Sequence, residues 1–133
     1  METPLHRQTR RVVFGDVDMA GWMHFPRVFA YFEEAEHEWL RLQGLPIIDA
    51  EEGGWPRARV ECDYKIPLRF GDEIEVRLGV ERVGSSSVTW LFEIWKGDLR
   101  AANGRVVNVR VDPSGRPLPL DATTRAKLGA GAG

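Results

Sequence analysis

The sequence predicts an α+β domain in which an antiparallel β-sheet wraps around one long central α-helix. Three observations support this fold class: one segment has helical periodicity, several segments alternate polar and apolar residues, and short turns separate the alternating segments. Strands joined by short turns are antiparallel, and one helix covers a five-stranded sheet only when the sheet curls around it. The expected order of elements is β–α–β–β–β–β.

A short strand over residues 8–14 is expected to precede the helix, which the periodicity places over residues 26–43. Pro26 suits the first helical position because its missing N–H would have no partner there. Gly44, followed by Leu45 and Pro46, is a stop signal. Along the helix, apolar residues recur at spacings of three and four: Phe25, Val28, Phe29, Phe32, Ala35, Trp39 and Leu40.

Strict alternation predicts four further strands, over residues 57–66, 73–83, 87–96 and 100–112. Glycine-containing turns separate the last three of them. The small residues at 129–133 are expected to fray. Leu91 and Trp95 fall on the face opposite to Trp90 and Phe92, and such outward apolar groups favour a homo-oligomer over ordinary scattered surface hydrophobicity.

Length and composition predict a single domain over residues 1–133. A net charge of −2 gives no sign of a nucleic-acid or anionic-membrane partner. No apolar run approaches the ~20 residues that span a bilayer, and the N-terminus lacks a signal-peptide pattern. The single cysteine, Cys62, excludes an internal disulfide. We therefore expect a cytoplasmic protein with neither a membrane nor a nucleic-acid partner.

The stretch FGDVDMAGWMHFP, residues 14–26, places Asp18 just before the predicted helix. A helix N-terminus offers unpaired N–H groups and a partial positive charge, which can stabilise an oxyanion. A nearby carboxylate can attack a carbonyl carbon or activate water. Gly21 would allow a tight turn. The alternative is an ordinary Asp-rich turn, which the spacing alone favours.

This stretch, followed by an acidic, aromatic-rich helix ending in GLP, resembles the 4-hydroxybenzoyl-CoA thioesterase and YbgC-like group of hotdog-fold acyl-CoA thioesterases. The resemblance continues in VECDYKIPLRFGDEIEV (60–76), in RVGSSSVTW (82–90) and in the closing VRVDP (109–113). It covers roughly residues 8–113 and implies hydrolysis of an acyl-CoA to the free acid and coenzyme A. Coenzyme A is then part of the substrate, and no cofactor is expected.

The resemblance also implies roles for individual residues. Asp18 falls on the catalytic carboxylate, as nucleophile or general base, and the Phe25 backbone N–H falls on the oxyanion donor. Family active sites lie at a subunit interface of dimers that often pair into tetramers, which implies a homo-oligomer here. Gly21, Trp22, Met23 and His24 are expected to contact the acyl group, and Arg82, Ser85, Ser86 and Ser87 the coenzyme A.

This chain departs from the family pattern at Trp22, His24 and Arg27, so hydroxybenzoyl specificity is not carried over. Three alternatives stay open: an acyl-thioester-binding protein without catalysis, a thioesterase for acyl-carrier protein, and His24 as a general base paired with Asp18. The three histidines show no metal-ligand spacing, so no metal is expected. Cys62 lies in the apolar phase of its strand and is interpreted as an inert core residue.

Overall fold

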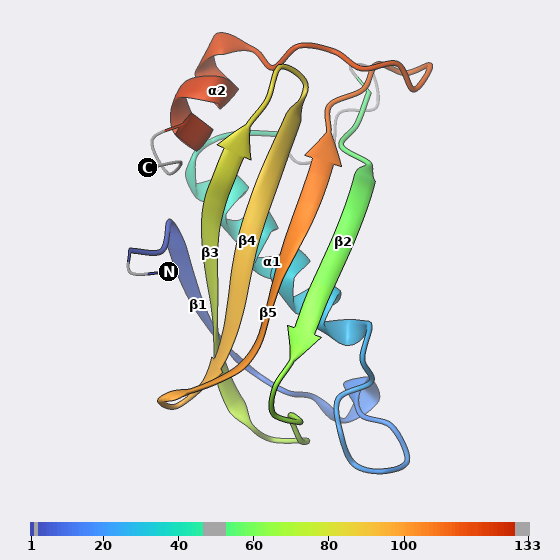
Figure 1. Ribbon diagram of the computed structural model, residues 1–133, viewed down its shortest axis with the longest axis vertical. Helices are drawn as coiled ribbons and strands as arrows, with labels where there is room; N and C mark the ends of the chain where they lie inside the picture. Colours follow the sequence, from blue (N-terminus) through green and yellow to red (C-terminus); the bar gives the residue numbers. More distant parts are fainter. Residues whose placement is uncertain (2, 47–52, 130–133) are drawn as a thin grey trace.

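The computed structural model describes residues 1, 3–46 and 53–129. One five-stranded antiparallel sheet, in the order β1-β3-β4-β5-β2, wraps around the long helix α1 (Figure 1). The predicted fold class and element order are confirmed. In chain order the elements are β1 (His6–Arg11), the short 3-10 helix η1 (Phe14–Asp16), α1 (Arg27–Leu42), β2 (Arg57–Tyr64), β3 (Glu73–Val83), β4 (Ser87–Lys96), β5 (Leu99–Val109) and α2 (Ala122–Gly129).

The core lies between α1 and the concave face of the sheet. The β3–β4 register pairs Leu78 with Phe92 and Val80 with Trp90, which places these side chains on the face toward the helix. Trp90 is packed edge-on against Phe32 and Trp39 of α1, with ring centroids 6.3 and 5.6 Å away. The helical face that covers the sheet consists of Val28, Tyr31, Phe32, Ala35 and Trp39.

The element boundaries agree with the predicted ones for β3 and β4 and differ elsewhere. β1 ends at Arg11 rather than at residue 14, because residues 14–16 form the η1 turn. The helix begins at Arg27, and Pro26 is its N-cap (φ −74°, ψ −11°) rather than its first residue. β2 ends at Tyr64, and β5 covers Leu99–Val109.

The second helix, α2, was not predicted. Only Thr124 and Leu128 of its eight residues are buried, so its periodic signal is weak. The Asp121 carboxylate accepts a hydrogen bond from the Thr124 N–H at 2.7 Å and caps the helix. Gly129, expected to begin a frayed tail, instead ends α2, and residues 130–133 lie outside the described residues. No helix in the described ranges is long and apolar enough to cross a membrane.

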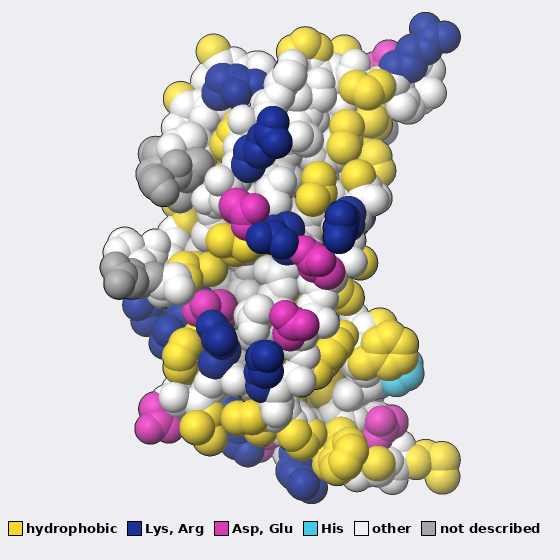
Figure 2. All heavy atoms as spheres, viewed as in Figure 1, with side chains coloured by type: hydrophobic (Ala, Val, Ile, Leu, Met, Phe, Trp, Pro, Cys, Tyr) yellow, Lys and Arg dark blue, Asp and Glu magenta, His cyan; other side chains and the backbone are white. Residues whose placement is uncertain are grey.

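The face of the sheet away from α1 is charged, as the mixed blue and magenta groups of Figure 2 show. Arg105 makes ion pairs with Glu61 at 2.6 Å and with Glu81 at 2.7 Å. Trp95, predicted to be an outward apolar group, is covered by Arg77, whose Cζ lies 4.3 Å from the ring centroid. The chain itself therefore covers part of the surface from which an oligomer was predicted.

Exposed apolar side chains gather instead along β2, at the margin of the sheet. Val60 and Tyr64 remain 46% and 49% exposed although they share the helix-side face with Val106 and Ala102 of β5. Phe25, just before α1, is 66% exposed. In Figure 2 hydrophobic groups line the side of the molecule on which β2 lies in Figure 1. The unpaired edge of β2 is thus bordered by uncovered apolar surface.

Candidate active site

A tight loop after η1 holds the Asp18 carboxylate. Its Oδ1 accepts hydrogen bonds from the Ala20 N–H at 2.9 Å and the Trp22 N–H at 3.3 Å. Gly21 completes the turn with φ +83°, a conformation that favours glycine, and its N–H donates to the Asp18 carbonyl at 2.9 Å. Among the described residues, no donor reaches the second oxygen, Oδ2. One carboxylate oxygen is therefore fixed in the loop while the other lacks a protein partner.

This carboxylate borders a largely apolar cleft of about 410 Å³ at the start of α1. One wall comes from the loop and the helix start, and the other from the end of β2 and the segment that follows it. Of the residues predicted to contact an acyl group, Trp22, Met23 and His24 lie on the wall, whereas Gly21 is not among the lining residues. The lining consists of Asp18, Trp22, Met23, His24, Phe25, Val28, Tyr64, Lys65, Ile66, Pro67, Leu68 and Ala102.

The Phe25 N–H is available at this cleft, because it has no acceptor among the described residues. It immediately precedes Pro26, the N-cap of α1, so it lies at the positive end of the helix dipole. The Phe25 carbonyl accepts a hydrogen bond from the Tyr64 hydroxyl at 2.7 Å. Burial raises the pKa of Tyr64 to about 12, so its hydroxyl stays a neutral donor. One cleft thus contains a carboxylate oxygen and a backbone donor that both lack partners among the residues described.

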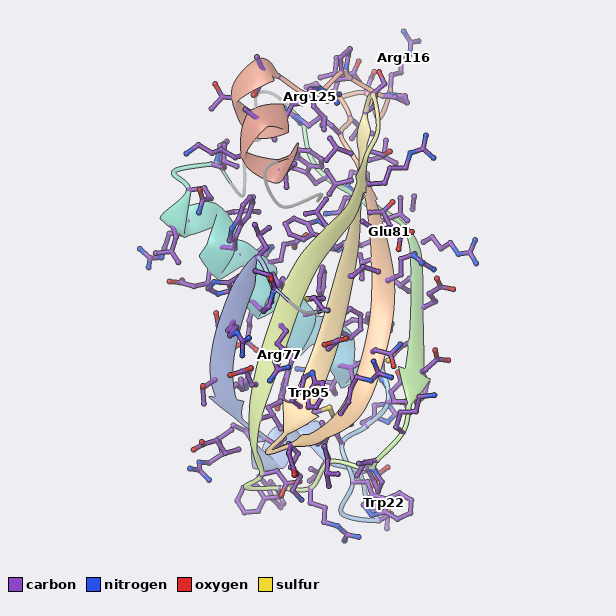
Figure 3. The ribbon with its side chains drawn as sticks, turned by 60° about the vertical axis from the view of Figure 1, so that its left-hand side comes forward. Trp22, Arg77, Glu81, Trp95, Arg116 and Arg125 are labelled. Atoms are coloured by element: carbon purple, nitrogen blue, oxygen red, sulfur yellow. The ribbon has the colours of Figure 1, made fainter. Side chains whose placement is uncertain are left out.

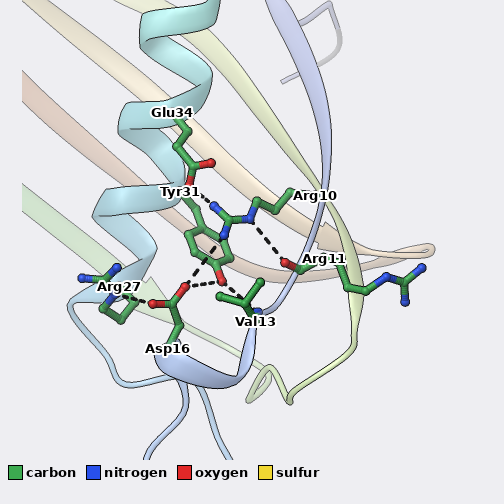
Figure 4. Close-up of polar contacts among 7 residues, drawn as sticks. All are labelled: Arg10, Arg11, Val13, Asp16, Arg27, Tyr31 and Glu34. Atoms are coloured by element: carbon green, nitrogen blue, oxygen red, sulfur yellow. Dashed lines mark hydrogen bonds and ion pairs between the residues drawn. The ribbon is translucent and has the colours of Figure 1, made fainter.

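The other aspartate of the motif, Asp16, is buried away from the cleft. Its Oδ2 accepts a hydrogen bond from the Tyr31 hydroxyl at 2.6 Å, and its Oδ1 accepts one from Arg27 Nε at 2.8 Å (Figure 4). Both oxygens are therefore occupied within the protein. The sequence motif alone did not identify Tyr31 and Arg27 as partners, although their positions on the first turns of α1 face the preceding loop.

Neither His24 nor Cys62 has the contacts of a catalytic group. The His24 ring packs edge-on against Phe25, with centroids 5.2 Å apart, and among the described residues it makes no hydrogen bond that would pair it with Asp18. Burial raises the pKa of the half-buried Cys62 thiol to about 11, which keeps it protonated and weakly nucleophilic at neutral pH.

The residues predicted to bind coenzyme A lie far from the cleft of the same chain. Residues 84–86 form the turn that joins β3 to β4 at the opposite end of the sheet, and Ser87 begins β4. The ten residues of β4 span ~33 Å. Arg125 donates to the carbonyls of Gly84 and Ser85 at 2.7 and 3.2 Å and marks this end in Figure 3, whereas Trp22 marks the other. Within one chain, the structure does not bring Arg82 or the serine turn to Asp18.

One cluster has side chains of the types that bind metals, but its carboxylates are bonded to protein groups. Ligand atoms of Glu33, Glu36 and His37 lie within 4.8 Å of one another. Arg57 makes ion pairs with Glu33 at 2.9 Å and with Glu36 at 2.7 Å, and Asn108 Nδ2 donates to Glu36 at 2.9 Å. A guanidinium therefore already binds both of these carboxylates and offsets part of their charge.

Comparisons with known proteins agree on one family. A family model described as the thioesterase-like superfamily matches residues 12–128. A 1,4-dihydroxy-2-naphthoyl-CoA hydrolase of Synechococcus sp. (strain CC9605) is 29% identical over 116 residues, which are 81% of this chain and 78% of the relative. The solved structure of BH1999 gentisyl-coenzyme A thioesterase is 27% identical with a TM-score of 0.82, covering 90% of this chain and 98% of that one. The PA5185 protein of Pseudomonas aeruginosa strain PAO1 is 31% identical with a TM-score of 0.87, covering 98% and 93%.

Proposed function

The chain belongs to the thioesterase-like superfamily, as its resemblance to the hotdog thioesterases predicted, and we propose that it hydrolyses acyl-CoA thioesters in the cleft beside Asp18. One observation carries the proposal. The cleft contains both the Asp18 carboxylate and the Phe25 N–H at the start of α1. Backbone N–H groups fix one carboxylate oxygen, and within the part of the chain that the structure describes neither the other oxygen nor the Phe25 N–H has a partner.

Two routes lead from this geometry to the same products. In the first, Asp18 Oδ2 attacks the thioester carbon, the C–S bond breaks, coenzyme A leaves as a thiolate, and water then hydrolyses the mixed anhydride. In the second, Asp18 accepts a proton from water, whose oxygen attacks the same carbon before the C–S bond breaks. Both consume one water and release the free acid and coenzyme A.

The Phe25 N–H supplies the electrophilic part of the mechanism. As the carbonyl carbon becomes tetrahedral, its oxygen gains negative charge, and a fixed N–H at a helix start stabilises that charge more than it stabilises the neutral carbonyl. Removing one such donor typically costs about 10²- to 10³-fold in rate. The thiolate is a good leaving group, so the mechanism needs no strong general acid.

The cleft favours an aromatic acyl group. Its walls are mainly apolar and carry the exposed rings of Trp22, Phe25 and Tyr64, which can pack against a planar ring. Two of the relatives are named for aromatic acyl-CoA substrates, a dihydroxynaphthoyl and a gentisyl thioester. The His24 side chain on the same wall offers hydrogen-bonding capacity for a polar substituent.

We further propose that a second copy of the chain completes the coenzyme A site. Pairing two β2 edges about a two-fold axis normal to the sheet would place the partner's serine turn beside the Asp18 end of the first chain. The exposed Val60, Tyr64 and Phe25 border that edge and would be covered. Arg82 and Ser85–Ser87 would then contact the coenzyme A held at the other chain's Asp18.

Thiol release from a panel of aromatic, short-chain and long-chain acyl-CoAs tests the proposed activity, with Asp18→Asn beside the wild type. We expect rapid release from the aromatic members and a loss of about 10²- to 10⁴-fold in the variant. Binding of acyl-CoA without release would support the non-catalytic alternative. Release that needs a carrier-protein thioester would redirect the substrate assignment.

Mixing two inactive variants tests the shared site. Asp18→Asn and Arg82→Glu homo-oligomers are unfolded together, refolded, and assayed against each variant refolded alone. If one site draws on two chains, the mixture contains sites with both wild-type residues and recovers activity. A mixture no more active than its parents would contradict the placement of Arg82 on the partner chain.

A further inference from the structure

We propose that Asp16 is a positioning residue that fixes Asp18 relative to the Phe25 N–H through its bonds to Tyr31 and Arg27. The inference rests on the proposed function, because it assigns those two groups to one reaction. Asp16 does not line the cleft, and both its oxygens are occupied, so it acts through the loop rather than on the substrate.

The Asp16 side chain ties the loop to α1 and β1. Tyr31 is buried in the core, and its hydroxyl donates to Asp16 at 2.6 Å, whereas Arg27 Nε donates at 2.8 Å from the first turn of the helix. Arg10 of β1 stacks on the Tyr31 ring at 3.9 Å from the centroid and lies 3.9 Å from Asp16 Oδ2 (Figure 4). Two secondary-structure elements therefore hold one carboxylate that is only 8% exposed.

The Asp16 backbone closes the base of the same loop. Its N–H donates to the Val13 carbonyl at 3.1 Å, and its carbonyl accepts from the His24 N–H at 2.8 Å. Asp18 follows two residues after Asp16, and Phe25 follows one residue after His24. A single residue thus fixes both the side of the loop that carries the carboxylate and the side that carries the oxyanion donor.

The hydrogen bonds of the Asp16 side chain can hold this residue in a fixed position. A buried carboxylate is stable only when donors compensate its lost hydration, so displacing Asp16 from Tyr31 and Arg27 is unfavourable. Burial, and then the hydrogen bond to Asp16, raise the pKa of Tyr31, so the hydroxyl remains a donor at neutral pH. Small displacements of reacting groups cost rate, since attack requires close alignment of the reacting atoms.

Asp16→Asn and Tyr31→Phe test the inference, with Glu38→Gln as a matched control. An asparagine presents one acceptor oxygen to two donors, and phenylalanine keeps the ring while it removes the hydroxyl. Glu38 forms an exposed ion pair with Arg41 at the far end of the same helix. We expect kcat per folded molecule to fall about tenfold in each of the two test variants while KM stays within twofold, and the control to match the wild type.

Two further readouts separate positioning from stability. The double variant is expected to lose less kcat than the product of the two single losses, because both substitutions weaken the contact between Asp16 and Tyr31. The Ala20 and Trp22 amides, which hold Asp18, are expected to exchange faster with solvent in Asp16→Asn, with unchanged protection of β4. A variant whose kcat per folded molecule equals that of the wild type overturns the inference, whereas a wild type that releases no thiol overturns the proposed function instead.

Discussion

The contact between Tyr64 and Phe25 gives a quantitative prediction for Tyr64→Phe. The Tyr64 hydroxyl donates to the Phe25 carbonyl at 2.7 Å and so fixes the residue whose N–H is proposed to stabilise the oxyanion. The net contribution of a hydrogen bond is ~0.5–1.5 kcal/mol. Because Tyr64 is half exposed, we assign its hydrogen bond a contribution in the middle of that range, about 1 kcal/mol. Because 1.36 kcal/mol corresponds to tenfold in rate, kcat is expected to fall about fivefold.

The assay is steady-state thiol release on the best aromatic acyl-CoA, with the melting temperature measured in parallel. Phenylalanine keeps the ring that lines the cleft, so KM is expected to change less than twofold. Since burial raises the pKa of Tyr64 to about 12, the ratio of variant to wild-type kcat should stay constant from pH 6 to pH 10. An unchanged kcat in a fully folded variant would refute the claim that this bond orients the Phe25 amide.

Two further predictions concern the scaffold. Arg57→Met leaves Glu36, only 2% exposed, without its guanidinium partner and is expected to lower the free energy of unfolding by ~3–5 kcal/mol in a denaturant titration; a loss below 1 kcal/mol would contradict the role of the ion pair. Because burial raises the pKa of Cys62 from 9.0 to about 11, the unfolded chain loses this proton first, and the free energy of unfolding should decline from pH 9 to pH 11. Cys62→Ala should flatten that decline, and a variant with the wild-type slope would argue against it.

Local patterns were sufficient to predict most of the fold. Alternation over 73–83 and 87–96 predicted β3 and β4 to the residue, because one face of each strand is buried against α1. The α2 helix escaped prediction because its burial depends on the sheet end that it covers rather than on its own pattern. The contact of Arg77 with Trp95 joins neighbouring strands and has no signal in either strand alone.

The sequence likewise predicted only part of the candidate site. The motif predicted Asp18 and the helix start, which the chain places in one cleft because only six residues separate Asp18 from Phe25. The different environments of Asp16 and Asp18 depend on Tyr31, whose hydroxyl donates to the Asp16 carboxylate, whereas the Asp18 carboxylate lines the cleft. The separation of the serine turn from Asp18 follows from strand length and hairpin topology, which become evident only once the sheet is assembled.

The most direct test of the central claim is the ratio of kcat for Asp18→Asn to kcat for the wild type on the best acyl-CoA. Asparagine retains an oxygen that can accept from Ala20 and Trp22, so the loop and the melting temperature should be preserved. Asp98→Asn, in the exposed β4–β5 turn, is the matched control. The account predicts a fall of at least about 10²-fold in Asp18→Asn and none in the control. A folded Asp18→Asn protein that keeps a rate within threefold of the wild type would contradict it.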